Sequence, residues 1–465
     1  VADPNDAKIL YGAFEVEGVH KSTDGGKTWT AINDGIRKGV KIIEVAISPA
    51  NSSELFCIGS IDWNGYAYWS DNGGTNWHQV TKLASDHTGD PTSGMGNLSA
   101  PTNVTYCPTD PKKLYISSNW RPVFSDDAGR SWQERDRGAD ISCVYDIRFS
   151  KHRAYAACMD EGVLFTKDDG STWQQAWPGG GAGADQISGH FWRIALSDNG
   201  QGVDRIVSTC SPWNANLPNR IVLSDDGGKT YKISDSGLPA YRPHANTMWG
   251  QSYPRALAVD PTNPRTLYLG MDGDSEGPDK PGGGIFKSTD GGSTWARLPH
   301  QPGALRVFFG LAVDPTDPKR LYWGACGTGG GLYRSDDAGE SWQRVFQNEQ
   351  WLFNVLVAPD GTVYAPGQNL WRSADHGQTW KKLTNLPEGQ IMGLEVHPHD
   401  PRTLWLSTVK HGGAVWGQIL KTTDGGATWQ DITGDIGFRK PAVLRFNPET
   451  NELWAGGVGL FKVKQ

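Results

Sequence analysis

The densest group of carboxylates in the chain lies between Met271 and Asp279, where Asp272, Asp274 and Glu276 alternate with smaller residues. Four carboxylates within residues 272–279 cannot all stay ionised at close range without a partner. One resolution is a raised pKa, which would make one of them a general acid. Another is a calcium ion held near Asp272, Asp274 and Glu276 through oxygen ligands. A solvated loop is the third interpretation, and the glycine and proline of the segment favour the loop or calcium over a preorganised acid.

Two other carboxylates, Glu15 and Asp62, follow short apolar segments elsewhere in the chain. Hydrolysis of a glycosidic bond needs two carboxyl groups, one acting as acid and the other as base or nucleophile. The candidate catalytic residues are therefore Glu15, Asp62, Asp272 and Asp274.

Tryptophans recur in the same kind of segment, the loops between predicted strands. Exposed aromatic rings stack on sugar rings, while carboxylates and amides bind hydroxyl groups. Each ring could instead pack beneath its own loop, but so many together favour a carbohydrate or peptide surface. The candidate substrate-binding residues are Trp63, Trp120, Trp192, Trp213, Trp249 and Trp351.

The elements that would position these loops are set by a repeated octapeptide, Ser-x-Asp-x-Gly-x-Thr-Trp, which occurs in nine variants that close between Trp29 and Trp429. Its spacing of 38 to 64 residues is typical of a β-propeller. One repeat predicts four strands and a tight Asp-Gly-Gly hairpin turn between the last two. In the sixth repeat these strands are residues 256–259, 266–270, 284–288 and 294–298.

Ten such repeats can be distinguished, with the first and the last incomplete, which suggests that residues preceding Val1 are missing. The sequence predicts an all-β propeller of about ten four-stranded antiparallel blades, forming one domain over residues 1–465. Two facing propellers that divide near residues 235–250 are the alternative. The octapeptides should lie on the outer rim with buried tryptophans. The loops from second to third strand, and from blade to blade, should gather on one face around the channel.

The architecture decides which carboxylates can cooperate. In a single ring, Glu15 and Asp62 lie on neighbouring blades, while Asp272 lies across the channel. In two facing rings, Glu15 pairs better with Asp272 or Asp274. An inverting pair requires about 6.5–9.5 Å between carboxyl groups and a retaining pair about 5–5.5 Å.

Composition excludes several classes of function. The net charge is −7 and the basic residues are scattered, which disfavours nucleic-acid binding. The sequence has no apolar stretch of 18 residues, the length that would be needed to span a membrane. Six cysteines form no C-x-x-C pair, and no phosphate-binding loop is present. We therefore expect no cysteine-bound metal centre, and no cofactor apart from the calcium considered above. The oligomeric state stays open.

The nine octapeptides resemble Asp-box (BNR) repeats, which are structural hairpins in the families that carry them. Three such families are relevant. Sialidases contain an Arg-Ile-Pro motif that is absent here. The sortilin type is a single ten-bladed ring that binds peptides without chemistry. Xyloglucan-degrading enzymes of glycoside hydrolase family seventy-four have two seven-bladed propellers and an aspartate base in the first blade.

Residues 10–21 stand in the place of that first-blade motif, and Glu15 aligns with its aspartate, although the flanking Arg, Thr, Asp and first Gly are replaced. The resemblance implies a secreted glycoside hydrolase that acts on a polysaccharide through paired carboxylates. The alternative is a non-catalytic extracellular or cell-surface binding propeller.

Overall fold

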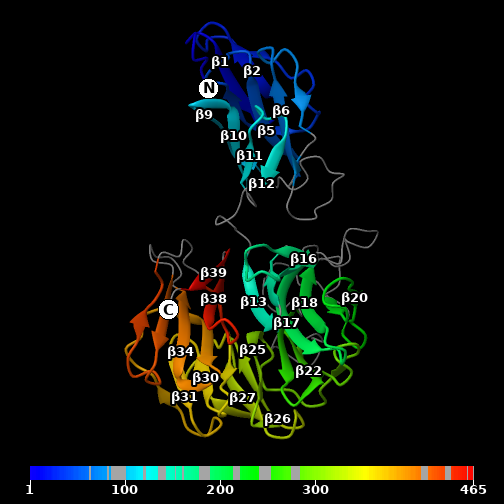
Figure 1. The fold of residues 1–465 in the computed structure, drawn as a ribbon, viewed down its shortest axis with the longest axis vertical. Coiled ribbons are helices and arrows are strands. Elements are labelled where there is room, and N and C mark those ends of the chain that lie inside the picture. Colours follow the sequence, from blue (N-terminus) through cyan, green and yellow to red (C-terminus); the bar gives the residue numbers. More distant parts are fainter. Residues whose placement is uncertain are drawn as a thin grey trace. The chain divides into compact units, whose positions relative to one another are not determined.

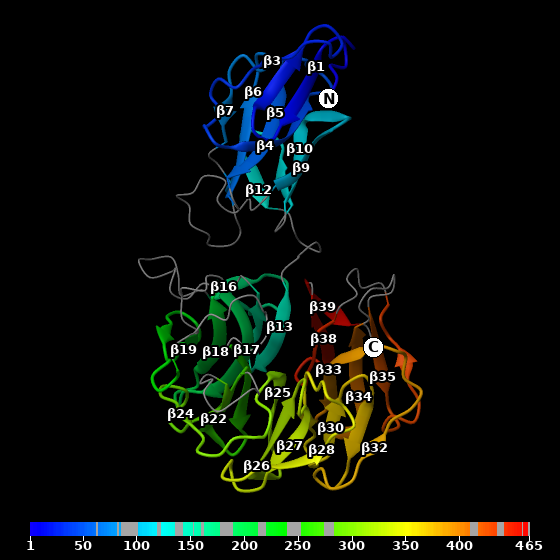
Figure 2. The same cartoon turned by 180° about the vertical axis from the view of Figure 1, so that it is seen from behind.

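The computed structural model describes residues 1–61, 64–80, 83–84, 101–118, 122–134, 143–151, 153–159, 162–176, 189–212, 220–239, 253–273, 283–409, 417–434, 441–457 and 459–463. These residues form two compact units, Val1–Ile141 and Ser142–Gln465, and each is considered by itself. The described residues are folded into strands and turns without a helix (Figures 1 and 2). Accordingly, none of them belongs to a helix that could cross a membrane.

The first unit contains three sheets that lie next to one another. Their strands are β1 (Leu10–Phe14), β2 (Gly18–Ser22) and β3 (Thr30–Ala31); β4 (Lys41–Ile47), β5 (Leu55–Ile61), β6 (Asn64–Ser70) and β7 (His78–Gln79); and β8 (Leu83–Ala84), β9 (Pro101–Cys107), β10 (Asp110–Ser118), β11 (Val123–Ser125) and β12 (Trp132–Glu134). Within each sheet neighbouring strands are antiparallel, except that β8 pairs with β12 in parallel. β4 contacts both β1 and β9, so the three sheets stand side by side as consecutive blades.

The second unit contains seven sheets. The first four are β13 (Val144–Ser150), β14 (Arg153–Cys158), β15 (Gly162–Thr166) and β16 (Gln174–Ala176); β17 (Gly189–Asp198), β18 (Asp204–Pro212), β19 (Arg220–Ser224) and β20 (Lys232–Ile233); β21 (Pro254–Asp260), β22 (Asn263–Met271), β23 (Gly284–Ser288) and β24 (Ala296–Arg297); and β25 (Val307–Asp314), β26 (Asp317–Ala325), β27 (Gly331–Ser335) and β28 (Gln343–Phe346).

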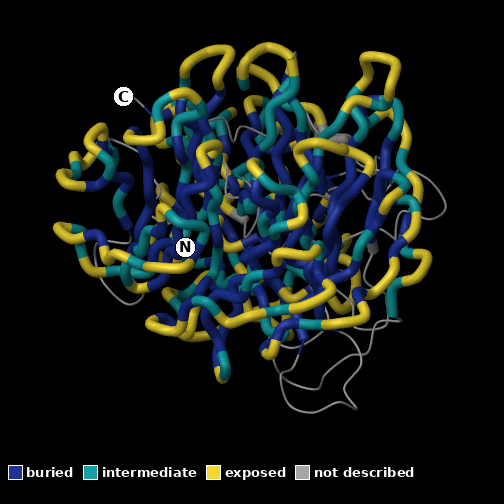
Figure 3. Tube along the Cα trace, turned by 90° about the horizontal axis from the view of Figure 1, so that it is seen from below, coloured by how far each residue is buried: buried dark blue, intermediate teal, exposed yellow. Residues whose placement is uncertain are grey.

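The remaining three sheets complete the second unit. They are β29 (Leu356–Val357), β30 (Val363–Pro366), β31 (Leu370–Ser373) and β32 (Lys381–Lys382); β33 (Gln390–His397), β34 (Asp400–Val409), β35 (Gly417–Thr422) and β36 (Gln430–Asp431); and β37 (Val443–Asn447), β38 (Glu452–Gly457) and β39 (Gly459–Val463). Each of these seven sheets runs in sequence order from its first to its last strand, and in six of them this is the four-stranded meander of a propeller blade. The strands are mostly buried and their connections are mostly exposed (Figure 3).

These seven sheets close into a ring. Successive sheets contact one another from β13 to β37, and β13 in turn contacts β37 and β38. A core cluster joins Val144 and Ile147 to Val443 and Trp454 across this junction. The ring of Trp173 packs edge-on against Trp454 at 6.0 Å between centroids. The last sheet is therefore held against the first by the same kind of packing that joins other neighbours.

The described residues form ten sheets, as ten repeats require, and the boundary between the compact units lies between Ile141 and Ser142. The single domain over residues 1–465 and the alternative division near residues 235–250 stay predictions. Repeat counting identifies blades, whereas ring closure depends on which distant blades pack together. The contacts of β13 with β37 and β38 decide that in the second unit.

The Asp box of the sixth repeat shows why the octapeptide forms a hairpin. Asp290 Oδ1 accepts hydrogen bonds from the backbone N–H groups of Ser293 at 2.9 Å and Thr294 at 3.0 Å, and its Oδ2 accepts one from the Thr294 hydroxyl at 2.7 Å. Ser288 Oγ accepts the Gly292 N–H at 2.9 Å, and Gly292 has φ +86°, which favours glycine. Burial alone would raise the pKa of Asp290, but these hydrogen bonds lower it to about 2.

The same arrangement recurs at the other boxes, with Asn72 in place of the aspartate in the second. The corresponding aspartates are Asp24, Asp127, Asp168, Asp226, Asp337, Asp375 and Asp424. Each box joins the last two strands of its sheet, so the turns lie at the outer edges of the sheets, as expected.

The expected burial of every box tryptophan is only partly confirmed. Trp77, Trp132 and Trp295 are buried, five of the closing aromatics are half-buried, and Trp29 is exposed. The buried rings are covered by the preceding sheet: Trp295 Nε1 donates to the carbonyl of Ser234 at 3.0 Å, for example. Trp29 belongs to the first sheet, where its indole N–H bonds the carbonyl of its own box at Gly26. Burial of the box aromatic therefore depends on the neighbouring blade as well as on the motif.

Candidate functional site

The second unit carries an aromatic and arginine cluster where its inner strands β17, β21 and β25 begin. Trp192 lies 4.8 Å from Tyr145 and 6.3 Å from Phe308, measured between ring centroids. The guanidinium of Arg255 stands 4.7 Å from the Trp192 ring centre and 4.9 Å from that of Phe308. Antiparallel sheets bring the connections from second to third strand to this same end, which we call the loop face.

Trp192 was expected to bind substrate, and its surroundings show how it is held. Its side chain is only 5% exposed, and its indole Nε1 donates to Ser211 Oγ at 2.7 Å. Arg255 lies against one side of the ring at cation–π distance. Because of these contacts, Trp192 is a buried packing residue beneath the loop face.

Asp272, a predicted catalytic residue, comes directly after β22 and is completely buried. Its Oδ1 accepts the backbone N–H of Val307 at 3.2 Å, and its Oδ2 lies 3.9 Å from Arg255 Nε. Burial lowers the pKa of Arg255, and the Asp272 carboxylate opposes that shift. The arrangement enables Asp272 to orient Arg255 against the aromatic rings.

Trp351, another predicted binding residue, lies in the connection between β28 and β29 and is 38% exposed. Its ring stacks on Phe353 with centroids 6.1 Å apart and planes inclined by 25°. The backbone of Trp351 bridges to Cys326, which follows β26. An indole that is supported on one side and partly exposed suits stacking on a sugar.

Glu15 belongs to the first unit, in the turn between β1 and β2. Its side chain is exposed, and Oε1 accepts a hydrogen bond from Lys41 Nζ at 3.0 Å. An exposed ion pair of this kind contributes little to stability. The other predicted site residues, Asp62, Trp63, Trp120, Trp213, Trp249 and Asp274, lie outside the described residues, as does Glu276 of the expected calcium site.

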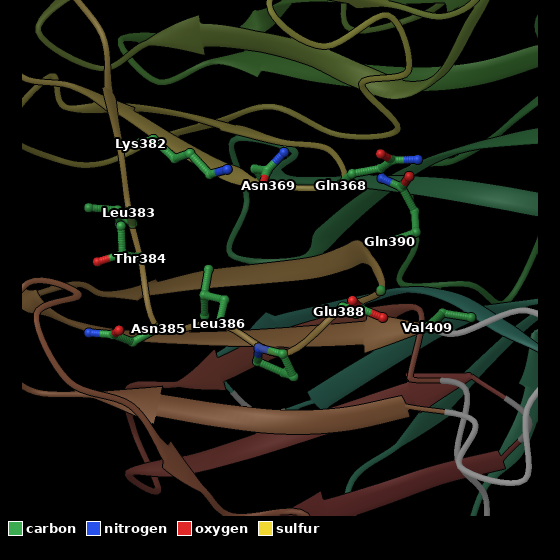
Figure 4. Close-up of a pocket in the computed structure, with 12 residues that line it drawn as sticks. Gln368, Asn369, Lys382, Leu383, Thr384, Asn385, Leu386, Glu388, Gln390 and Val409 are labelled. Carbon is green, nitrogen blue, oxygen red and sulfur yellow. The ribbon is translucent and has the colours of Figure 1, made fainter.

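A groove of about 730 Å³ opens between the sheets β29–β32 and β33–β36. Figure 4 shows Lys382, Asn369 and Gln368 along one side, with Leu386 and Glu388 along the other. Its lining includes four side-chain amides and one hydroxyl group: Gln368, Asn369, Lys382, Leu383, Thr384, Asn385, Leu386, Pro387, Glu388, Gly389, Gln390 and Val409. Amides both donate and accept hydrogen bonds, which suits the hydroxyl groups of a glycan.

A buried carboxylate connects the groove to the loop that carries Trp351. Glu349 Oε1 accepts hydrogen bonds from the Asn369 backbone N–H at 3.2 Å and from Asn369 Nδ2 at 2.6 Å. The same oxygen accepts the indole N–H of Trp371 at 3.3 Å. Glu349 thereby fixes the position of Asn369 at the groove, two residues away from Trp351 in the chain.

Sequence reasoning missed the groove, because Gln368, Asn369 and Gln390 belong to no recurring motif. A weak signal was available. Residues 367–369 connect a second strand to a third, and residues 383–389 connect two blades, so both segments belong to the loop classes expected on the functional face.

No protein-family model matches the chain. Among curated proteins, a xyloglucanase from Paenibacillus sp is 30% identical over 211 residues, which are 40% of this chain and 17% of that enzyme. A xyloglucanase from Hypocrea jecorina is 26% identical over 357 residues, covering 66% of this chain and 40% of that enzyme. The chain therefore spans well under half the length of these curated relatives.

Among solved structures, the GH74 enzyme of Niastella koreensis matches with a TM-score of 0.64 and 16% identity, covering 100% of this chain and 74% of that enzyme. This likeness shows the fold: the chain is an all-β propeller protein similar to GH74 enzymes, as the Asp boxes indicated.

Proposed function

We propose that the chain is a glycoside hydrolase that acts on a polysaccharide, with xyloglucan as the first candidate substrate. The observation that carries the proposal is the amide-lined groove, which Glu349 connects to the loop of the partly exposed Trp351, in a chain whose curated relatives are xyloglucanases. Amides that bind hydroxyl groups and an indole that stacks on a pyranose ring are the two contacts a neutral glycan requires. Because such polymers lie outside cells, the proposal includes an extracellular or cell-surface location.

The proposed chemistry uses one carboxyl group to protonate the leaving oxygen and a second to activate water or attack the sugar. Glu15 supports this role by its exposure, which leaves it open to a substrate. Asp272 is enclosed by Val307 and Arg255, which favours a positioning role for it. We therefore propose Asp62, which follows β5 in the same unit as Glu15, as its partner, and keep Asp274 as a separate candidate in the second unit.

Incubation with a panel of plant and microbial polysaccharides tests the proposal. We expect xyloglucan oligosaccharides to appear, and Glu15→Gln and Asp62→Asn each to lower kcat by about 10²–10⁴-fold, the range of one acid–base contribution. Glu340→Gln, an exposed carboxylate at a box turn, is the matched control and should retain full activity. Asp272→Asn should weaken activity together with thermal stability, because it acts through Arg255.

Two outcomes would overturn the proposal. The protein could be retained on a glycan-containing affinity gel, equally in the parent and in Glu15→Gln, without forming any product. That result would establish the non-catalytic binding propeller instead. Absence of both product and binding across the panel would exclude both functions.

A further inference from the structure

The second unit encloses a cavity of about 460 Å³ on the axis of its ring. All seven sheets contribute to its wall through β13, β17, β21, β25, β29, β33 and β37 or the residues next to them. It is therefore the central channel of the seven-bladed ring, and it is distinct from the groove between β29–β32 and β33–β36.

One wall of this axial cavity is strongly charged. Asp146, completely buried, lies 3.2 Å from Arg148 Nη2, 3.3 Å from Arg193 Nη1 and 3.1 Å from Arg445 Nη2. Burial alone would raise the pKa of Asp146, but the three guanidinium groups lower it below its usual value. The carboxylate is therefore ionised and shared among three cations.

Glu395 is the second carboxylate at the cavity. Its Oε2 lies 3.5 Å from Arg445 Nη1, and its Oε1 accepts the backbone N–H of Phe446 at 3.2 Å. The described cavity wall thus holds three arginines and Glu395, with Asp146 behind it in contact with all three arginines, so this cluster has one positive charge uncompensated. Within low-dielectric walls such a charge attracts an anion more strongly than it would at an open surface.

Two of the arginines can still reach a ligand. The Arg148 side chain is 31% exposed and that of Arg445 is 14% exposed. Arg445 Nε is in addition a buried donor without a hydrogen-bond partner. A buried donor left unpaired costs free energy, and an acceptor on a bound molecule would remove that cost.

Apart from Asn354, the remaining side chains that line the cavity are apolar. Aliphatic side chains from four inner strands line it, several of them only partly buried by protein: Leu196, Leu257, Val259, Leu311, Val313, Leu356 and Val357. A hydrated inorganic ion makes no use of such a surface, whereas an organic anion with an apolar body buries its carbon skeleton there.

We propose that the axial cavity of the seven-bladed ring binds a small organic monocarboxylate, with its head group at Arg148 and Arg445 and its apolar body against Val259 and Leu356. The single excess positive charge matches a monoanion, and guanidinium groups bind carboxylates in a fork geometry. The site is separate from the groove proposed for glycans, so it stands independently of the hydrolase activity.

A purely structural role for the arginines accounts for only part of this arrangement. Asp146 on β13 does connect Arg193 on β17 with Arg445 on β37, and so contributes to ring closure. That role needs neither Glu395 nor an exposed Arg148. A bound organic anion accounts for the excess charge and for the aliphatic side chains beside it.

Calorimetric titration with sodium benzoate, with neutral benzamide as the control probe, tests the inference. Benzoate should bind and benzamide should not. Glu395→Gln removes one negative charge and should tighten benzoate binding about tenfold, the scale of one charge–charge interaction in a partly screened site. Arg148→Gln should weaken it about tenfold. The matched controls, Glu340→Gln and Arg402→Gln, change the same charges at exposed positions and should leave the affinity unaltered.

The pH dependence provides a second measurement on the same variants. Burial raises the pKa of Glu395, and Arg445 and Arg148 oppose this while Asp146 adds to it. Protonation of Glu395 raises the positive charge of the cavity, so benzoate should bind more tightly as pH falls toward the Glu395 pKa. The titration must stay above the pKa of benzoic acid itself, and the trend should be absent in Glu395→Gln.

Equal affinity for benzoate and benzamide would overturn the inference, as would an unchanged affinity in Glu395→Gln. If Arg148→Gln does not fold, the Glu395→Gln arm still decides, because that substitution increases binding and cannot do so by unfolding the ring. Polysaccharide hydrolysis plays no part in either readout.

Discussion

Asp290 and Asp146 are both aspartates whose pKa lies below its ordinary value, yet the causes differ. Asp290 is held by hydroxyl and N–H groups within four residues of itself. Asp146 is held by guanidinium groups on three strands, one of them 299 residues away in the chain. The first arrangement is local and repeats with the motif. The second depends on which blades meet at the axis of the ring, so it does not repeat with the motif.

The difference predicts a large penalty for Asp146→Asn. The substitution preserves shape but leaves the cluster of arginines without its central negative charge, and breaking a buried ion pair by removing one partner costs about 3–5 kcal/mol. Denaturant unfolding should show a loss of this size. Adding Arg193→Met should recover part of the loss, since it removes one of the uncompensated cations. A variant as stable as the parent would mean that water in the cavity solvates the arginines well enough to replace the carboxylate.

Asp290→Ala should cost less. It removes the acceptor for Ser293, Thr294 and Ser288, and loss of comparable side-chain-to-backbone caps costs about 0.5–2 kcal/mol. The same denaturant experiment measures it, with hydrolysis of polysaccharide followed in parallel. Activity should persist, because the box lies at the outer edge of its sheet. Loss of all activity in a variant of parental stability would contradict the structural role of the boxes.

The same contrast explains what the sequence could predict. Local chemistry specifies strands and turns: the predicted third strand of the sixth repeat, residues 284–288, is identical to β23, and the predicted first strand, residues 256–259, lies within β21. The residue types at Asp290 and Gly292 are enough to predict the hairpin between them. These inferences need only neighbours in the chain.

Ring closure and the axial cavity could not be predicted, because they depend on residues that are far apart in the chain. Arg445 looks like any basic residue on a strand until β37 lies against β13. The groove at Asn369 likewise depends on two blades meeting side by side. Asp272 was identified as a carboxylate of interest from its crowded segment, but its burial against Arg255 and Val307 depends on β21 and β25, which lie on either side of it in sequence.

The smallest predicted effect is the pH dependence of the Asp290→Ala penalty. The folded-state pKa of Asp290, about 2, lies below the unfolded value of 3.8, so the ionised carboxylate stabilises the native state above that unfolded value. As pH falls from about 4 toward 2, the unfolded chain binds the proton first, and the contribution of Asp290 declines. The difference in unfolding free energy between parent and Asp290→Ala should therefore shrink over this range, as measured by urea unfolding at each pH. A constant difference would show that the hydrogen bonds of the box do not depend on the ionised form, and that the contrast with the ion pairs of Asp146 is one of distance alone.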